Sequence, residues 1–252
     1  MTVAPSPPFE DAVAESALLG GRVRLRQPVK GYRAGMDAAL LAAAVAAEPG
    51  QRVIEAGCGA GAVLMQIAAR RPGVSLTGLE RDPAMAALAR ENAVLNGVDA
   101  AILEGDVAAG FRALDLPPFD WAVSNPPFFD DPGALRAPAE GKRGAWMADD
   151  GLKAWTNFLL KSVREGGRIV VIHRADRLAD LLALLGETAG SFAVRGVHPH
   201  ADEPAKRVLV QAIKTGKAPL RLLPPLVLHD RSGAKHTAEA EAILRGEAGL
   251  EW

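Results

Sequence analysis

The sequence predicts an α/β protein whose sheet is mostly parallel and covered by helices on both faces. Three observations support this class. Short apolar segments rich in strand formers alternate with longer helix-like segments between residues 52 and 213. Gly and Pro separate most of these segments, and 49% of the residues are hydrophobic, which is ample for one large core. The last two apolar segments leave no room for a helix between them, so we expect them to pair antiparallel.

The N-terminal elements come first. Residues 1–17 are expected to be disordered, because they are rich in Pro, then acidic, and show no periodicity. Residues 19–27 contain a Gly-Gly turn followed by strict alternation, which predicts a short hairpin or edge strand. A helix of Ala and Leu is expected at residues 36–47, ended by Pro49-Gly50. Residues 18–48 therefore form an N-terminal hairpin and helix.

Residues 49–215 are expected to form the main domain, with seven strands joined mainly by helices. The strands are expected at residues 52–56, 75–79, 100–103, 119–124, 168–172, 193–197 and 206–213. The helices are expected at residues 60–71, 83–95, 148–164 and 175–185, with Asp82 as the N-cap of the second. Residues 216–252 are expected to be an extension packed on the domain, with an amphipathic helix at residues 234–245.

Composition excludes several classes of protein. The single cysteine, Cys58, excludes an internal disulfide and fits a reducing cytoplasm. The sequence contains no run of eighteen apolar residues, so we expect no membrane-spanning helix. The N-terminus has Pro and acidic residues in place of the basic and apolar pattern of a signal peptide. We therefore expect a cytoplasmic protein. No obligate protein partner is evident.

The net charge is −1, but basic residues gather in two segments that contain no acid. Residues 18–36 carry Arg22, Arg24, Arg26, Lys30 and Arg33, and residues 204–221 carry Lys206, Arg207, Lys214, Lys217 and Arg221. Two basic segments in a protein of nearly neutral net charge are typical of a protein that binds a polyanion at one defined surface. The alternative is solvated strand edges, where Lys and Arg deter aggregation.

A rigid corner is expected directly after the strand at residues 119–124. Two prolines stop that strand, because neither has an N–H to donate, and the first biases Asn125 to extended geometry. Asn125 and Pro126 can each accept one N–H of a planar group that bears an NH2, while the Phe128 ring stacks on its face. The alternative is a plain turn with a solvated Asn.

A glycine-rich loop with Gly57, Gly59 and Gly61 follows the first strand of the main domain. Glycines there let the backbone turn sharply and let a ligand approach the main chain. Gly57 and Gly59 with Ala62 also satisfy a loose dinucleotide fingerprint. A nicotinamide enzyme, however, has no obvious use for the corner at Asn125.

Two acids end the strands that follow the glycine-rich loop. Glu80 ends the second strand, where it is placed to accept both hydroxyls of a ribose. Asp106 follows the third strand, where it can accept from an adenine amino group. In open α/β sheets, ligands bind at this end of the strands.

These segments together resemble the sequential motifs of class I S-adenosylmethionine-dependent methyltransferases that methylate amino groups. The resemblance implies a Rossmann-like fold, S-adenosyl-L-methionine as cofactor, S-adenosyl-L-homocysteine as product and no metal. It implies the glycine loop at the methionine part, Glu80 at the ribose and Asp106 at the adenine. The implied cofactor-binding residues are Glu55, Ala56, Gly57, Gly59, Gly61, Glu80, Arg81, Asp106, Val107 and Asn125. The implied catalytic residues are Asn125, which binds the target NH2, Pro126 and Phe128.

The flanking segments narrow the resemblance. Residues 30–37, 226–230 and 237–240 look like those of the bacterial tRNA adenine-N6 methyltransferases that act on a valine tRNA, over residues 18–246. Several relatives have Tyr where this chain has Phe128, and a ring that only stacks can be either. The implied partner is tRNA or another structured RNA. The implied substrate-binding residues are Phe128, Arg22, Arg24, Lys142 and Arg143, with the two last in a long loop at residues 129–147.

Other interpretations stay open. Relatives with the same corner modify other RNAs or a protein glutamine, although the glutamine family usually carries a helical N-terminal domain that residues 1–35 cannot form. A small-molecule or purely binding role is a third possibility. Cys58 fits a small residue in a tight loop better than a catalytic thiol. His198 and His200, with Asp202 and Glu203, can in principle ligate a metal, but their segment is more typical of a surface turn.

Overall fold

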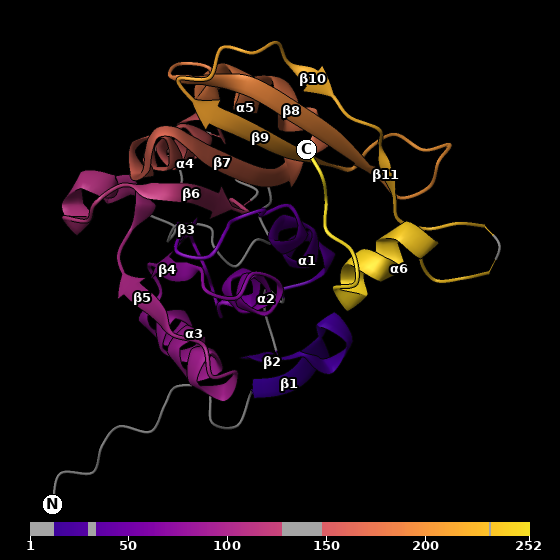
Figure 1. The fold of residues 1–252 in the computed structure, drawn as a ribbon, viewed down its shortest axis with the longest axis horizontal. Helices are drawn as coiled ribbons and strands as arrows, with labels where there is room; N and C mark the ends of the chain where they lie inside the picture. Colours follow the sequence, from indigo (N-terminus) through magenta and orange to yellow (C-terminus); the bar gives the residue numbers. More distant parts are fainter. Residues whose placement is uncertain (1–12, 30–33, 128–147, 232) are drawn as a thin grey trace, which may run out of the picture.

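The computed structural model describes residues 13–29, 34–127, 148–231 and 233–252. It contains a two-stranded hairpin and a nine-stranded mixed sheet, in the order β10-β8-β9-β7-β6-β3-β4-β5, with β11 also paired to β8. The strands of the large sheet are β3 (Arg52–Ala56), β4 (Ser75–Glu80), β5 (Ala100–Glu104), β6 (Phe119–Ser124), β7 (Val163–Arg174), β8 (Ala189–His198), β9 (Arg207–Lys214), β10 (Arg221–Leu222) and β11 (Leu226–Val227). The expected α/β class and mostly parallel sheet are confirmed (Figure 1).

Strand direction defines two edges of the sheet. The strands β4 and β6 pair parallel with β3, β5 pairs parallel with β4, and β7 pairs parallel with β6. The strand β9 is antiparallel to both β7 and β8, so the expected antiparallel pair is confirmed. The strands β3 to β8 therefore all end at one edge, which we call the carboxyl edge. The opposite edge is called the amino edge.

Helices cover both faces of the sheet, as the sequence predicts (Figure 1). On one face, Val53, Val123 and Val170 pack with side chains from α1 (Met36–Ala43), α2 (Ala62–Arg70) and α3 (Pro83–Leu95). On the other, alternate residues such as Ile54 pack with α4 (Ala148–Ser162) and α5 (Leu178–Leu185). This period-two alternation gives each strand two buried sides. Asp82 caps α3 through Ala84 N and Met85 N, as expected.

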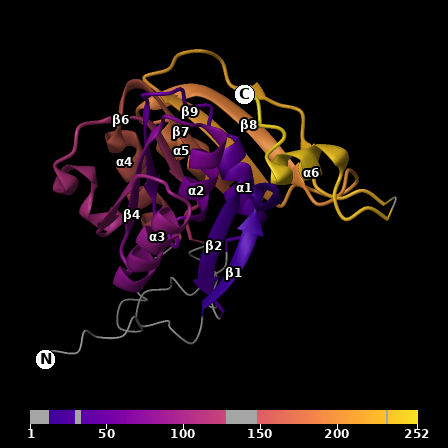
Figure 2. The same cartoon turned by 60° about the horizontal axis from the view of Figure 1, so that its bottom comes forward.

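The N-terminal hairpin corrects one expectation. Residues 13–17 are not disordered, because β1 (Val13–Leu18) pairs antiparallel with β2 (Val23–Pro28). The turn between them has Gly20 and Gly21 at φ of 65° and 93°. The sequence of β1 is a weak strand pattern, so its pairing with β2 decides its structure. The hairpin packs beside α2 and α3 (Figure 2).

Several boundaries also differ from the expected ones. The helix α1 ends at Ala43 instead of residue 47, and α4 ends at Ser162, where β7 begins at once. The C-terminal helix α6 is Ala238–Arg245, since Thr237 accepts from Ala240 N and sets its start. The sheet gains two short strands beyond the seven expected, β10 and β11, both from the C-terminal extension.

His173, near the end of β7, makes stability depend on pH. Burial, together with the nearby positive charges of Arg177, Arg174 and Arg207, lowers its pKa to about 4. Between about pH 6.5 and about pH 4 the unfolded chain binds a proton that the folded chain does not, so stability falls as the pH falls. The full difference amounts to up to about 3 kcal/mol at about 1.4 kcal/mol per pKa unit. Denaturant unfolding of wild type and His173→Gln near neutral pH and near pH 4.5 measures it. An equal acid loss in both would contradict this assignment.

Candidate functional site

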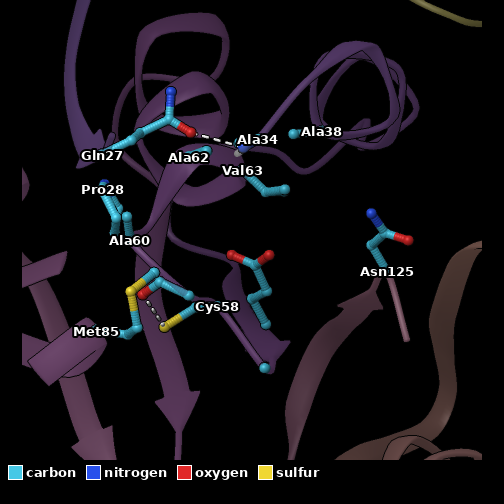
Figure 3. A pocket seen from close by; sticks show the side chains of 13 residues that line it. Gln27, Pro28, Ala34, Ala38, Cys58, Ala60, Ala62, Val63, Met85 and Asn125 are labelled. Carbon is cyan, nitrogen blue, oxygen red and sulfur yellow. Dashed lines mark hydrogen bonds between the residues drawn. The ribbon is translucent and has the colours of Figure 1, made fainter. Parts of the chain in front are cut away.

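A pocket lies at the carboxyl edge, where three parts of the chain meet (Figure 3). Glu55 of β3 lines it together with Gly57, Cys58 and Gly59 of the following loop, and Asn125 lines it directly after β6. The N-terminal region contributes Gln27, Pro28 and Ala34, which lie above the loop in Figure 3. The sequence-predicted glycine loop and Asn125 therefore line one pocket.

The glycine loop has a backbone that favours glycine at three positions. Gly57, Gly59 and Gly61 have φ values of 70°, 55° and 81°. The N–H groups of Gly57 and Cys58 donate to Leu79 O on β4, at 2.8 and 3.0 Å. The loop is thus fastened to the neighbouring strand, with its turns in a region of backbone space that other residues seldom adopt.

Trp155 of α4 holds the loop from the other side. A Cβ atom added to Gly57 would lie 2.3 Å from Cη2 of the Trp155 ring. Glycine is therefore required at position 57 for two reasons. The Trp155 ring leaves no room for a Cβ atom, and the positive φ is one that other residues seldom adopt. The sequence did not indicate Trp155, since nothing in the pattern of α4 distinguishes it from an ordinary core residue.

Two buried glutamates have different roles in this region. Glu55 is only 3% exposed and lines the pocket. Glu80 is buried at the end of β4, and its Oε2 accepts from Gly59 N at 2.9 Å while its Oε1 accepts from Asp82 N at 3.0 Å. Each carboxylate oxygen has a second lone pair. Glu80 thus shapes the loop and keeps acceptor capacity.

The remaining expected cofactor residues surround this arrangement. Ala56 is fully buried at the end of β3, and its carbonyl accepts from Ser124 Oγ at 2.9 Å, which aligns the ends of β3 and β6. Asp106 is exposed and accepts from Ala108 N at 2.9 Å, as the cap of a short helical turn that contains the buried Val107. Arg81 is exposed after Glu80.

The corner after β6 is described as far as Pro127. Asn125 is half-buried at the pocket, and Pro126 is buried behind it. Phe128, Lys142 and Arg143 lie outside the described residues, as does the loop expected at residues 129–147.

Side chains far apart in sequence join the hairpin to the loop. The fully buried Asn92 of α3 accepts from Arg26 N at 2.8 Å, and its Nδ2 donates to Arg26 O and Ala60 O, both at 2.9 Å. Gln27 accepts from Ala34 N at 2.6 Å across the pocket. No sequence signal marks these residues, because each contact depends on the fold.

The expected substrate-binding arginines of the hairpin differ in their surroundings. Arg22 donates to the carbonyls of Arg245 and Gly246, at 3.3 and 2.8 Å, and so ties the hairpin turn to the end of α6. Arg24 pairs with Glu15 on β1 at 2.7 Å, yet its side chain is 57% exposed. Arg22 thus has a structural contact that the sequence did not indicate.

The described residues contain neither a metal-ligand cluster nor a membrane-spanning helix. Within residues 13–29, 34–127, 148–231 and 233–252, no group of three or more His, Cys, Asp or Glu has the arrangement of a metal site. The Nδ1 atom of His198 instead contacts the carbonyl of Glu203, at 2.7 Å. Over the same part of the chain, every helix is too short or too polar to cross a bilayer.

Comparison with known proteins decides the family. The model of the Methyltransferase small domain matches residues 33–137, which include the glycine loop, Glu80, Asp106 and Asn125. The crystal structure of a predicted O-methyltransferase from Agrobacterium tumefaciens superposes with a TM-score of 0.68 at 28% identity, over 85% of this chain and 98% of that one. The chain belongs to the class I S-adenosylmethionine-dependent methyltransferases. Its cofactor is S-adenosylmethionine.

Curated relatives of this methyltransferase have two kinds of substrate in their names. The tRNA1(Val) (adenine(37)-N6)-methyltransferase of Dickeya chrysanthemi is 26% identical over 220 residues, 84% of this chain and 86% of that protein. The release factor glutamine methyltransferase of Deinococcus radiodurans is 39% identical over 89 residues, 35% of this chain. The match spans only 30% of that enzyme's length.

The pocket's chemistry fits the cofactor of this class. S-adenosylmethionine carries an ammonium and a sulfonium, and the buried carboxylate of Glu55 in the pocket wall complements positive charge. The glycines of this loop have no side chains, so a ligand can approach the backbone there closely. The pocket encloses about 30 Å³, room for only a water or two, so the cofactor would extend well beyond it. The methyltransferase has Glu80 and Asp106 at the ends of the next two strands, where a nucleoside would extend.

We expect Glu80→Ala to weaken binding of S-adenosylhomocysteine by about 1.5–3 kcal/mol, because it removes the acceptor of Gly59 N and the proposed ribose acceptor together. Calorimetric titration measures this. The matched control is Glu104→Ala on the adjacent strand, an exposed glutamate paired with Arg90. Unchanged affinity in Glu80→Ala would contradict the assignment.

Proposed function

We propose that this methyltransferase transfers a methyl group to the exocyclic amino nitrogen of an adenine in tRNA. The single observation that carries the proposal is that Asn125, at a proline-stopped corner, lines the same pocket as the glycine loop. An amide oxygen at this place suits an NH2 group as the methyl acceptor better than it suits a hydroxyl group. The NH2 group keeps an N–H that can stay hydrogen-bonded to the amide oxygen while the nitrogen receives the methyl group.

The chain's own residues supply positioning. The adenine amino nitrogen is a poor nucleophile, because its lone pair is delocalised into the ring. Asn125 Oδ1 and the Pro126 carbonyl would accept its two N–H groups, draw them out of the ring plane and direct the lone pair toward the cofactor. The bound cofactor supplies a methyl group already activated on a sulfonium. No general base is required before transfer, because the nitrogen would lose one proton to solvent after it becomes cationic, with a neutral thioether as the other product.

The adenine must leave its stack to reach the pocket, as in other enzymes that act on bases. Phe128 would stack on the extruded ring. We propose that Arg24, Lys142 and Arg143 contact phosphates around it. Arg22 can contact a phosphate only by giving up its hydrogen bonds to the carbonyls at the end of α6.

The match to the tRNA-modifying relative favours RNA over protein. It extends over 86% of the length of the Dickeya enzyme, whereas the match to the release factor enzyme of Xylella fastidiosa covers 55% of its length at 31% identity. A release factor glutamine remains the second candidate, since its amide NH2 would fit the same two acceptors and the Deinococcus release factor enzyme is 39% identical over 89 residues.

Methyl transfer from labelled cofactor to bulk tRNA and to a release factor, compared at equal concentrations, tests this function. We expect label in tRNA, and tRNA affinity that falls steeply between low and physiological salt. Charge reversal in Arg24→Glu should weaken tRNA binding and leave cofactor affinity unchanged. Label in the release factor alone, or a flat salt dependence, would contradict the proposal.

A further inference from the structure

A second cavity, of about 1050 Å³, lies toward the amino edge of the sheet, away from the cofactor pocket. Its walls come from β7, β8 and β9, from the loops before β3 and after α2, and from the C-terminal residues 248–252. Figure 1 shows the yellow C-terminal chain running from α6 to the neighbourhood of β8 and β9. The volume is at the upper end of the range for small-molecule sites.

Four arginines line this cavity: Arg71, Arg168, Arg195 and Arg221. In the part of the chain that the structure describes, none of them forms an ion pair with a carboxylate. Many arginines elsewhere do, including Arg24, Arg90, Arg164 and Arg245. The cavity therefore gathers guanidinium groups that form no direct ion pair with a described carboxylate.

Contacts to neutral groups hold three of these side chains in place. Arg71 Nε donates to Val45 O at 3.0 Å, and Arg195 donates to the carbonyls of Pro224 and Glu251, at 2.9 and 2.7 Å. The Arg168 guanidinium lies over the Trp121 ring, 5.2 Å from its centroid. Positioned guanidinium groups of this kind bind phosphate with little loss of side-chain entropy.

Gln211 gives an independent indication of a ligand. Its side chain is on β9 and lines the cavity, and the residue is only 6% exposed. No side-chain hydrogen bond joins it to another residue that the structure describes, and its amide atoms are accessible from the cavity. A buried amide normally has hydrogen-bond partners, and this one offers both donors and an acceptor to the cavity.

The cavity also has groups that accept from a ligand. Glu48, Glu239 and Glu251 line it beside the arginines. Carboxylates suit hydroxyl and N–H donors and oppose a plain anion, so the ligand must carry both an anion and donors. A nucleoside phosphate has this combination: phosphate oxygens, ribose hydroxyls and a planar base.

We propose that the cavity at the amino edge binds a free nucleoside phosphate. Arg168 holds the phosphate, Gln211 bonds the nucleoside, and the glutamates accept its hydroxyls. The site is separate from the cofactor pocket, which lies at the opposite edge of the sheet. Its occupant is thus a second ligand of the enzyme and not the methyl acceptor.

Calorimetric titration of the full chain with AMP tests the proposal, with S-adenosylhomocysteine present at saturation to fill the cofactor pocket. We expect AMP to bind, and Arg168→Gln and Gln211→Leu each to weaken its affinity at least tenfold. The control Arg112→Gln removes an exposed arginine outside the cavity and should change affinity less than twofold. Retained S-adenosylhomocysteine binding shows that each variant is folded.

Two comparison ligands define what is recognised. Adenosine and inorganic phosphate should each bind at least tenfold more weakly than AMP, because each lacks half of the contacts. No binding of AMP, or binding that both cavity variants leave unchanged, would overturn the proposal. Inorganic phosphate binding as tightly as AMP would overturn the nucleoside part. Arg168→Lys, which keeps the charge but loses the planar fork of donors, provides a second test of the phosphate contact if Arg168→Gln does not fold.

Discussion

Asn125→Ala is expected to lower the rate of methyl transfer in a single turnover by more than about a hundredfold, the scale of a positioned group that acts in the transition state. The side chain lies at the rim of the cofactor pocket, so the fold and much of the cofactor affinity should remain. Rates are normalised to the number of cofactor-binding sites, which separates chemistry from loss of folded protein.

Asn125→Asp is the sharper companion variant. It keeps an acceptor of similar size but adds a negative charge and removes the amide donor. If Asn125 only ended a strand, Asn125→Ala would cost some stability and leave the rate per folded molecule unchanged. That outcome would remove Asn125 from the proposed mechanism.

Gly57→Ala is expected to cost about 2–4 kcal/mol of stability, from backbone strain and overpacking together. The backbone has φ of 70°, and the new Cβ would lie 2.3 Å from the Trp155 ring. Cofactor affinity should fall as well, because the loop must shift to relieve the clash. Denaturant unfolding and calorimetry measure the two effects.

Gly97→Ala is the matched control for this substitution. Its φ is 63°, but no atom lies within 4 Å of the position that the new methyl group would take, so it carries the strain without the clash. A Trp155→Leu replacement in the Gly57→Ala background should recover part of the lost stability. Equal costs for Gly57→Ala and Gly97→Ala would contradict the role assigned to Trp155.

Local patterns predict much of the fold. The bounds of β6 and α3 agree with the sequence expectation, because Pro and Gly end them and Asp82 caps α3. The glycine loop and Asn125 are predicted to share one edge because parallel strands end together. Contacts between distant residues are not predictable in this way. Asn92 meets the hairpin and the loop only in the folded chain, and β1 depends on its pairing with β2.

The candidate site also combines features that the sequence predicts with contacts that it does not. The sequence predicts an acidic residue, Glu80, at the end of β4, and the structure places it there. Its bonds to Gly59 N and Asp82 N do not, since they depend on the turn of the loop. The sequence likewise does not reveal the structural contacts of Arg22, because its partners lie more than two hundred residues away, at the end of α6.

Mass spectrometry of nucleosides tests the proposed reaction most directly. Bulk tRNA is incubated with the methyltransferase and cofactor labelled in its methyl group, then digested to nucleosides. The proposal predicts label in N6-methyladenosine, and at least about a hundredfold less of it when Asn125→Ala is used for the same short time. Label on a ribose or another base, or no labelled nucleoside while a release factor glutamine is labelled, would contradict it.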